Sequence, residues 1–136
     1  LKLIKISGQG CHLVVKATFN KKNGFIILDT GASNSVFSKT HLENETENIE
    51  ENTDLINSTG IEGNFIQSQF VRIDKFSLGK LKIKNFNMVL MNLDHINNLY
   101  ADYTKIKIWG LLGSDFLNNY KAVINYSKKE LKLKIK

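Results

Sequence analysis

The sequence predicts a mainly β fold that includes one or two short helices. Both ends of the chain alternate between apolar and lysine side chains, imperfectly over residues 1–6 and cleanly over residues 131–136. Alternation of this kind is typical of strands with one buried face. Between the ends, apolar runs of strand length are separated by turns that contain Asn and Gly. The length of 136 residues suits one domain with a sizeable core, so a single domain over residues 1–136 is expected.

The composition favours a globular protein and excludes several other classes. Hydrophobic residues make up 42% of the chain, and eight residues are phenylalanine. No apolar run approaches the roughly 20 residues that a membrane-spanning helix needs, so no membrane span is expected in this chain. Cys11 is the single cysteine and cannot form a disulfide within the chain, which leaves the redox compartment open. Since the chain begins at Leu1 rather than at a methionine, a targeting segment could have been removed, and the localisation stays unknown.

The net charge of +6 is unevenly distributed along the chain. Residues 40–71 carry seven acidic side chains and no Lys or Arg, which leaves a charge of +13 on the remainder. Basic flanks can attract nucleic acid, but the chain has no arginine cluster and a single arginine, Arg72. Its aromatic residues also fall mainly at expected core positions rather than among exposed lysines. We therefore expect lysines on solvated strand faces and no nucleic-acid partner.

The first half of the chain predicts a hairpin followed by a loop. Residues 12–20 have strand character, residues 21–24 end in a turn-forming Asn-Gly pair, and residues 25–28 form the returning strand. Residues 36–37 predict a further short strand. Residues 41–57 are acidic, rich in Asn and weakly patterned, so we expect a loop there that contains at most one helical turn.

Two strand pairs are expected in the second half of the chain. Residues 54–56 and 65–73 form strand-like arms around a tip that contains glycine, and strands 75–84 and 85–91 follow as a second pair. The core candidates of the second pair are Phe76, Leu78, Leu81, Ile83, Phe86, Met88 and Leu90.

Two short helices are expected after these strands. Apolar side chains at helical spacing predict the first over about residues 94–104. The side chains that define this spacing are Leu93, Ile96, Leu99, Tyr100 and Tyr103. Ser114 is expected to cap the second helix, with Asp115 in a structural role in its positively polarised first turn. Strand character resumes over residues 123–126, before the last strand.

The stretch that carries chemistry is Asp29-Thr30-Gly31-Ala32, which directly follows the apolar run 25–28. A carboxylate at the end of a buried strand is costly to keep charged, so such a position indicates a functional role. Thr30 supplies a hydroxyl on a stiff stem, Gly31 lets backbone amides approach the carboxylate, and Ala32 leaves room for a second chain or a substrate. The tripeptide Asp-Thr-Gly alone is equally consistent with an ordinary turn at the end of a strand.

A second signature lies far downstream, where Leu111-Leu112-Gly113 leads into the expected second helix. With both signatures in this order, the chain resembles the retropepsin-like aspartic proteases over nearly its whole length. The resemblance implies a closed β-barrel of the acid protease fold, an aspartic endopeptidase activity and a catalytic role for Asp29. The residues that it implies as support for the active site are Thr30, Gly31 and Ala32.

Asp29 supplies only half of a proteolytic site. Peptide hydrolysis without a metal or a nucleophilic side chain needs one group that accepts a proton from water and another that donates one. No other aspartate is followed by Thr-Gly or Ser-Gly; these aspartates are Asp54, Asp74, Asp94, Asp102 and Asp115. A two-fold axis beside Asp29 would supply the second carboxylate from another copy of the chain. We therefore expect a homodimer that cleaves peptide or protein substrates with a water activated by two Asp29 carboxylates.

Two alternatives stay open at this stage. In retropepsin-like enzymes the terminal strands help to form the dimer interface, but the two ends of this chain could instead pair only within their own barrel. The domain could also be a catalytically silent module for dimerisation or peptide binding. The expected mark of such a module is the loss of Asp-Thr-Gly, which this chain retains.

The resemblance also implies a flap, which is a flexible hairpin between the two signatures that closes over bound peptide. Its expected tip is Gly60, Ile61, Glu62 and Gly63. Either glycine could adopt a positive φ there, so the residue at the very tip stays open.

No metal site or cofactor is expected. Neither His12 nor His41 has Cys or paired carboxylate partners at metal-ligand spacing, and His95 is a lone histidine on an expected helix.

The chain departs from the retroviral pattern at two linked positions. Ser33 and Ser114 stand where retroviral enzymes commonly carry an Asp and an Arg that form an ion pair. The chain therefore looks more like a cellular or bacterial member than a viral one. Ala32 follows the retroviral pattern and lacks the hydroxyl that bonds the aspartate in pepsin, which predicts a milder acid optimum than that of pepsin. The physiological substrate, the cleavage specificity and processing from a longer precursor stay open.

Overall fold

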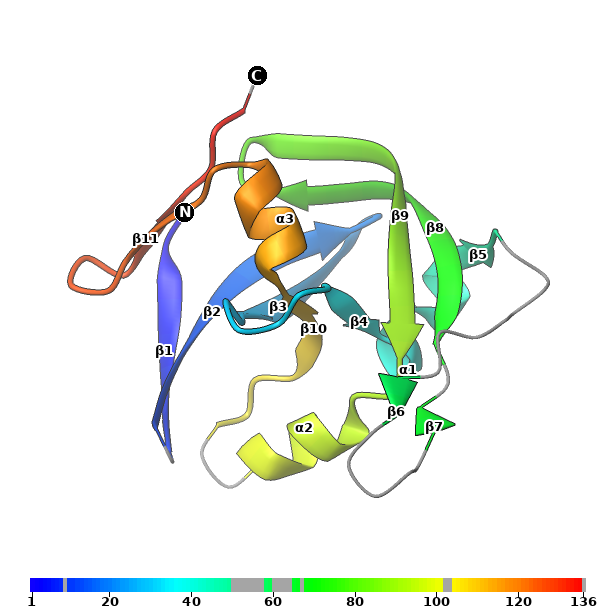
Figure 1. Cartoon of the computed structure of the whole chain (residues 1–136), viewed down its shortest axis with the longest axis horizontal. Coiled ribbons are helices and arrows are strands. Elements are labelled where there is room, and N and C mark those ends of the chain that lie inside the picture. The colour runs from blue at the N-terminus through cyan, green and yellow to red at the C-terminus, as the bar shows by residue number, and fades with distance from the viewer. Residues whose placement is uncertain (9, 50–57, 60–64, 67, 102–103, 136) are drawn as a thin grey trace.

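The computed structural model describes residues 1–8, 10–49, 58–59, 65–66, 68–101 and 104–135. Strands curve around a common core and short helices lie against them (Figure 1). The strands are β1 (Leu3–Gly8), β2 (Gly10–Phe19), β3 (Lys22–Leu28), β4 (Val36–Ser38), β5 (Thr46–Asn48), β6 (Ser58–Thr59), β7 (Phe65–Ile66), β8 (Gln69–Leu78), β9 (Leu81–Met91), β10 (Ile108–Leu112), β11 (Val123–Asn125) and β12 (Glu130–Lys132). The helices are α1 (Lys39–Leu42), the 3-10 turn η1 (Glu43–Glu45), α2 (Asp94–Tyr100) and α3 (Ser114–Asn119).

A closed barrel is formed by β2, β3, β10, β4, β9 and β8, in this order. The barrel closes because β8 also pairs with β2, where Thr18 lies opposite Ser77 and Phe19 lies opposite Phe76. β10 runs parallel to β3 and β4 runs parallel to β9, whereas the other pairs in the ring are antiparallel. β1 and β5 extend this sheet beyond β2 and β8. The prediction of a mainly β, closed barrel with a few short helices is confirmed.

Phenylalanine rings fill the centre of the barrel. Phe19, Phe37 and Phe76 come from three different strands and are at most 1% exposed. Their ring centroids lie 5.2 to 6.0 Å apart. Burial of each such side chain stabilises the fold by about 1.5–3 kcal/mol. All the core candidates predicted from β8 and β9 pack here: Phe76, Leu78, Leu81, Met88 and Leu90 are buried, and Ile83 and Phe86 are partly buried against the same cluster.

The turn of the first hairpin lies earlier than the Asn-Gly pair predicted. Phe19 pairs with Lys22, so the turn is made by Asn20 and Lys21, and Asn20 takes the positive φ of 56°. Gly24 instead lies inside β3, because the Trp109 ring packs on it. A Cβ at Gly24 would meet Trp109 Cδ2 at 2.4 Å, so this glycine is needed for close approach rather than for a turn.

The strand boundaries predicted for residues 65–91 are also wrong. One long strand, β8, runs through the expected break near residue 74, and β9 runs through the expected break between residues 84 and 85. The turn between these strands falls at Gly79, whose φ is 56°. Because Gly79 makes the turn, Asn85 remains within β9 despite its positive φ of 52°.

Both helices predicted in the second half are present, with different limits. α2 ends at Tyr100 rather than near residue 104, and Leu99 on its surface is 67% exposed, so Leu99 does not belong to the apolar face as predicted. α3 begins at Ser114 with Gly113 as its cap, so the predicted cap at Ser114 is wrong by one residue. Asp115 lies in the first turn of α3, as expected.

The segment predicted as a loop is more regular than expected. It contains α1, η1 and β5, and β5 pairs with β8 at the outer edge of the sheet. The helical turn begins at Lys39, which precedes the predicted segment, because Ser38 caps it by accepting a hydrogen bond from the His41 amide.

Both ends of the chain pair with each other. The amide of Leu3 donates to the carbonyl of Lys129 at 2.8 Å, and the amide of Leu131 donates to the carbonyl of Leu1 at 2.9 Å. Terminal strands are therefore confirmed at β1 and β12, although β12 ends at Lys132. These contacts join the two ends of one chain to each other.

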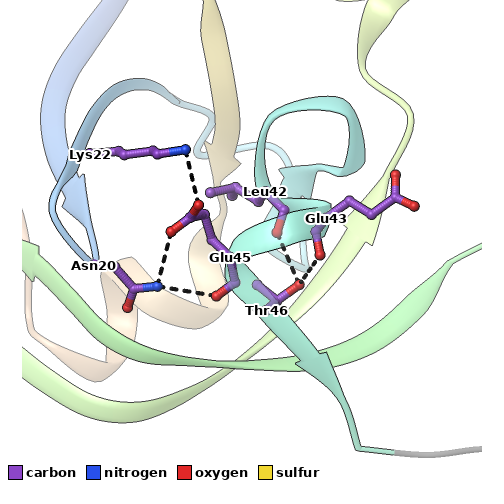
Figure 2. Close-up of polar contacts among 6 residues, drawn as sticks. All are labelled: Asn20, Lys22, Leu42, Glu43, Glu45 and Thr46. Carbon is purple, nitrogen blue, oxygen red and sulfur yellow. Dashed lines mark hydrogen bonds and ion pairs between the residues drawn. The ribbon is translucent and has the colours of Figure 1, made fainter.

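Glu45 fastens η1 to the first hairpin (Figure 2). Its carboxylate lies 3.0 Å from Lys22 Nζ, and Asn20 Nδ2 donates to Glu45 Oε1 at 3.3 Å and to its backbone carbonyl at 3.2 Å. The same asparagine accepts a hydrogen bond from the Lys75 amide, so its side chain ties the turn to both β8 and η1. The hydrogen bond from Lys22, and after it the one from Asn20, lowers the pKa of Glu45.

We expect Glu45→Gln to lower the free energy of unfolding slightly at pH 7 and to have no such effect in acid. A carboxylate whose pKa is lower in the folded than in the unfolded state contributes stability above its unfolded pKa, and that contribution is lost as the pH falls through the folded value. Urea unfolding at pH 7 and pH 3 measures the difference. Glu47→Gln, on exposed β5, is the matched control and should be neutral at both pH values. An equal loss for Glu45→Gln at both pH values would contradict this role.

Candidate active site

Asp29 directly follows β3, which is one of the six strands of the barrel. Its amide donates to the carbonyl of Leu112 at 2.9 Å, which continues the parallel pairing between β3 and β10 by one residue. The side chain of Asp29 is half-buried. The sequence prediction that an apolar strand delivers this carboxylate to a turn is therefore confirmed.

The turn after Asp29 is tight and holds the carboxylate. The amide of Gly31 donates to Asp29 Oδ1 at 3.2 Å, and the amide of Ala32 donates to the Asp29 carbonyl at 3.1 Å. Thr30 and Gly31 are exposed, and Ala32 is half-buried. The exposed residues beside the carboxylate leave it accessible from one side.

The second signature braces this turn. The amide of Ser114 donates to the Ala32 carbonyl at 2.7 Å, directly after Gly113. A Cβ on Gly113 would lie 2.8 Å from that carbonyl oxygen and 3.0 Å from the carbonyl carbon of Asn34, so only glycine allows the two backbones to approach this closely. Leu111 and Leu112 on β10 pair with Ile27 and Leu28 on β3. The structure thus brings both predicted signatures together.

Ser35 and Asp115 complete the brace. Ser35 donates from its amide to Asp115 Oδ2 at 3.0 Å and from its hydroxyl to Asp115 Oδ1 at 2.7 Å. The same hydroxyl accepts a hydrogen bond from the Gly113 amide at 2.9 Å. The structural role predicted for Asp115 is therefore supported, but Ser35 was not predicted, because its contacts are 78 and 80 residues away in the sequence.

Two further residues near Asp29 were not predicted as part of the site. Val14 of β2 lies opposite Ile27 of β3. The same antiparallel register, extended by two residues, sets His12 opposite Asp29. The His12 ring meets Tyr100 of α2 edge-on, with centroids 5.3 Å apart. Burial, and to a smaller extent the charge of Asp29, raises the pKa of the Tyr100 hydroxyl. That hydroxyl therefore remains protonated beside the carboxylate; no local sequence signal places α2 there.

A serine–histidine pair elsewhere does not form a nucleophilic site. Ser38 Oγ lies 2.8 Å from His41 Nδ1, and the His41 ring stacks on Trp109 with centroids 5.0 Å apart. Burial lowers the pKa of His41, Asp94 partly opposes this effect, and Lys107 adds to it. The Ser38 hydroxyl caps α1, and because Ser38 is fully buried a substrate cannot reach it.

The expected flap tip, Gly60–Gly63, lies outside the described residues. On either side of it, β6 and β7 pair antiparallel, with Ser58 opposite Ile66 and Thr59 opposite Phe65.

In the part of the chain that the structure describes, no three His, Cys, Asp or Glu side chains gather as metal ligands do. None of the described helices is long and apolar enough to span a membrane.

Comparison with known proteins agrees with this geometry. The sequence profile of the family described as aspartyl protease matches residues 15–116. The chain belongs to the aspartyl protease family, and its fold is retropepsin-like. A search of curated proteins finds no match.

Three solved structures illustrate the shared fold. The retroviral protease-like domain of Ddi1 from Leishmania major has a TM-score of 0.58 and 17% identity, covering 90% of this chain and 87% of its own. A retropepsin-like aspartic protease from Rickettsia conorii has a TM-score of 0.51 and 21% identity, covering 95% and 87%. The EIAV protease, in complex with the inhibitor HBY-793, has a TM-score of 0.51 and 18% identity, covering 88% and 97%.

Proposed function

We propose that this protein is an aspartic endopeptidase in which Asp29 is the catalytic residue. The observation that carries the proposal is the position of Asp29, on a turn held by its own Gly31 amide and braced by the second signature through Ser114 and Ala32. A carboxylate fixed on an accessible turn can exchange protons with a bound water. Residues 1–136 would act as one domain.

One copy of the chain provides one such carboxylate, so the active form is proposed to be a homodimer. A two-fold axis beside Asp29 brings two copies of the acid together, and Gly31 and Thr30 are exposed where a second chain would lie. Two carboxylates at close range share one proton, which makes one a base and the other an acid.

The proposed reaction uses a water held between the two Asp29 carboxylates. The unprotonated carboxylate takes a proton from the water while the water oxygen bonds to the peptide carbonyl carbon. The protonated carboxyl group donates its proton to the carbonyl oxygen. The resulting diol collapses when the C–N bond breaks, with one proton passing to the nitrogen and another returning from a hydroxyl to the dyad. Thr30 would brace the dyad, Gly31 and Ala32 would line the cleft, and Gly60–Gly63 would form the tip of a lid.

The surface near the chain ends supports a dimer. All but one of the large hydrophobic side chains exposed in the described part of the chain lie on β1, on β11 or in the segments that flank β1, β11 and β12. They are Leu1, Ile4, Val123, Tyr126 and Ile135, and the exception is Leu99 on α2. A dimer interface formed by the chain ends would cover these side chains and remove their apolar surface from water.

We expect Val123→Glu to weaken the dimer at least about tenfold, because the exchange removes an apolar contact and adds charge at the interface. Sedimentation velocity across a dilution series measures the dissociation constant, and peptide turnover per chain should fall at the same concentrations. Leu99→Glu is the matched control, because Leu99 is 67% exposed, against 58% for Val123, but lies on α2. A wild-type monomer that keeps its full activity on dilution would refute the shared site.

The alternative function is a silent module that dimerises or binds peptide without cutting it. A peptide-library cleavage assay across a range of pH separates the two, because only the enzyme produces new peptide termini. Intact peptides retained by the wild-type dimer at every pH would favour the module.

A further inference from the structure

A pocket separate from the Asp29 turn opens between α3 and the β8–β9 hairpin, which lie side by side in Figure 1. Its volume is about 400 Å³, within the range of small-molecule sites. Three phenylalanine rings line it: Phe37 and Phe116 are 1% and 6% exposed, and Phe86 is half-buried. The Phe86 ring stands at 87° to Phe116 and 88° to Phe37 and stacks on Phe76 with centroids 4.7 Å apart, so its orientation is fixed by packing.

The pocket also has polar lining side chains, one of them negatively charged. Asp115 and Asn119 come from α3 and Asn87 from β9, and Asn87 Oδ1 accepts a hydrogen bond from Arg72 Nε at 3.3 Å. Arg72 itself is not among the residues that line the pocket. Asp115 is exposed, and within the described residues the single ion pair is that of Lys22 and Glu45, so the Asp115 carboxylate has no cationic partner there. Each of its oxygens accepts one hydrogen bond from Ser35 and retains capacity for another.

The combination of aromatic walls and an uncompensated carboxylate selects the charge of a ligand. An aromatic ring attracts a cation at its face, and a carboxylate forms its stronger hydrogen bonds with charged donors. An anion would meet Asp115 with like charge, and a neutral apolar molecule would leave the carboxylate without a partner. The pocket therefore suits an ammonium group carried on an aromatic or branched apolar body.

We propose that this pocket binds a small organic cation of the arylalkylamine type, with its ammonium group at Asp115 and its ring among Phe37, Phe86 and Phe116. Occupancy is transmitted to the Asp29 turn. Asp115 holds Ser35, Ser35 accepts from the Gly113 amide, and the next amide, that of Ser114, holds the Ala32 carbonyl. A ligand that forms a hydrogen bond with Asp115 therefore perturbs the hydrogen bonds that hold the Asp29 turn, without entering the site where a peptide would lie.

The test is a titration of the uniformly ¹⁵N-labelled full chain with 3-phenylpropylamine, 3-phenylpropanol and 3-phenylpropionate, which share a ring and chain but differ in charge. We expect the amine to bind at least about tenfold more tightly than the alcohol, and the propionate not to bind. The amides of Ser35, Gly113 and Asn119 should shift together with the amine. The same titration on Asp29→Asn should give the same affinity, so the site is tested whether or not the protein is a protease.

Two variants sharpen this test. Asp115→Asn should remove the preference for the amine over the alcohol. Because that exchange also touches Ser35, Asn119→Lys provides an independent probe, since it places a cation at the rim and should abolish amine binding without altering the brace. Asn118→Lys on the same helix makes the same charge change outside the pocket and should leave binding unchanged. Equal affinities for amine and alcohol in the wild type, or wild-type amine binding by Asn119→Lys, would overturn the proposal.

Discussion

Replacing Asp29 with asparagine is expected to abolish peptide cleavage while leaving the barrel folded. The amide is nearly isosteric, and its oxygen can still accept the hydrogen bond that Asp29 Oδ1 receives from the Gly31 amide. It cannot accept a proton from water, so turnover should fall by at least about 10³-fold. Cleavage of a peptide by equal concentrations of both proteins, with circular dichroism and urea unfolding of each, measures the two effects separately.

The same variant should not weaken the dimer. In a dimer whose two Asp29 side chains meet at a desolvated interface, the exchange removes two like acids, so its stability should stay equal or rise. A tethered dimer with one Asp29→Asn chain should be as inactive as the double variant, because one of the two proton-transfer partners is missing. Wild-type turnover in this mixed dimer would end the shared-dyad mechanism.

Asp74→Asn is the control for the chemical change itself. Asp74 is exposed on β8 and is not part of the Asp29 turn, so its exchange should leave turnover and folding unchanged. Full activity in folded Asp29→Asn would remove Asp29 from the mechanism and favour the silent module.

The barrel and the position of Asp29 could be predicted because both depend on local patterns. Alternation along the terminal strands and apolar residues in β3, β8 and β9 reflect burial on the faces of a sheet, and burial is the main driving force of folding. The association of the two signatures could be predicted from resemblance alone, since their contacts join residues about 80 apart.

The errors occur where a contact distant in sequence decides a local structure. Gly24 looks like a turn residue, but the Trp109 ring from β10 needs its missing side chain, so the turn moves to Asn20. The strand break expected between residues 84 and 85 is also wrong, because the chain turns at Gly79, whose φ is positive. The position of Tyr100 beside Asp29 depends on how α2 packs against β2 and β3, which no periodicity within α2 contains.

Gly113→Ala is expected to lower the free energy of unfolding by about 2–3 kcal/mol, because it overpacks a site that has no room for a methyl group. The new Cβ would meet the Ala32 carbonyl oxygen at 2.8 Å and two atoms of the Asn34 carbonyl at 3.0 and 3.1 Å. All three are backbone atoms, which cannot turn aside as a flexible side chain would, so the Asp29 turn itself must move. Misplacement of a catalytic group by about 1 Å costs on the order of 10²-fold in rate, and turnover should fall accordingly.

Gly31→Ala separates this steric effect from the general effect of replacing a glycine near Asp29. At Gly31 the nearest atom to an added Cβ is Asp29 Oδ1 at 3.5 Å, an ordinary contact, and its φ is not positive. Its free energy of unfolding should therefore lie within about 1 kcal/mol of the wild type. Urea unfolding of both variants at one pH makes the comparison, with the amide signal of Ser114 as a probe of its bond to the Ala32 carbonyl. If Gly113→Ala proved as stable as Gly31→Ala, with the Ser114 amide unshifted, the second signature would not be what holds the Asp29 turn in place.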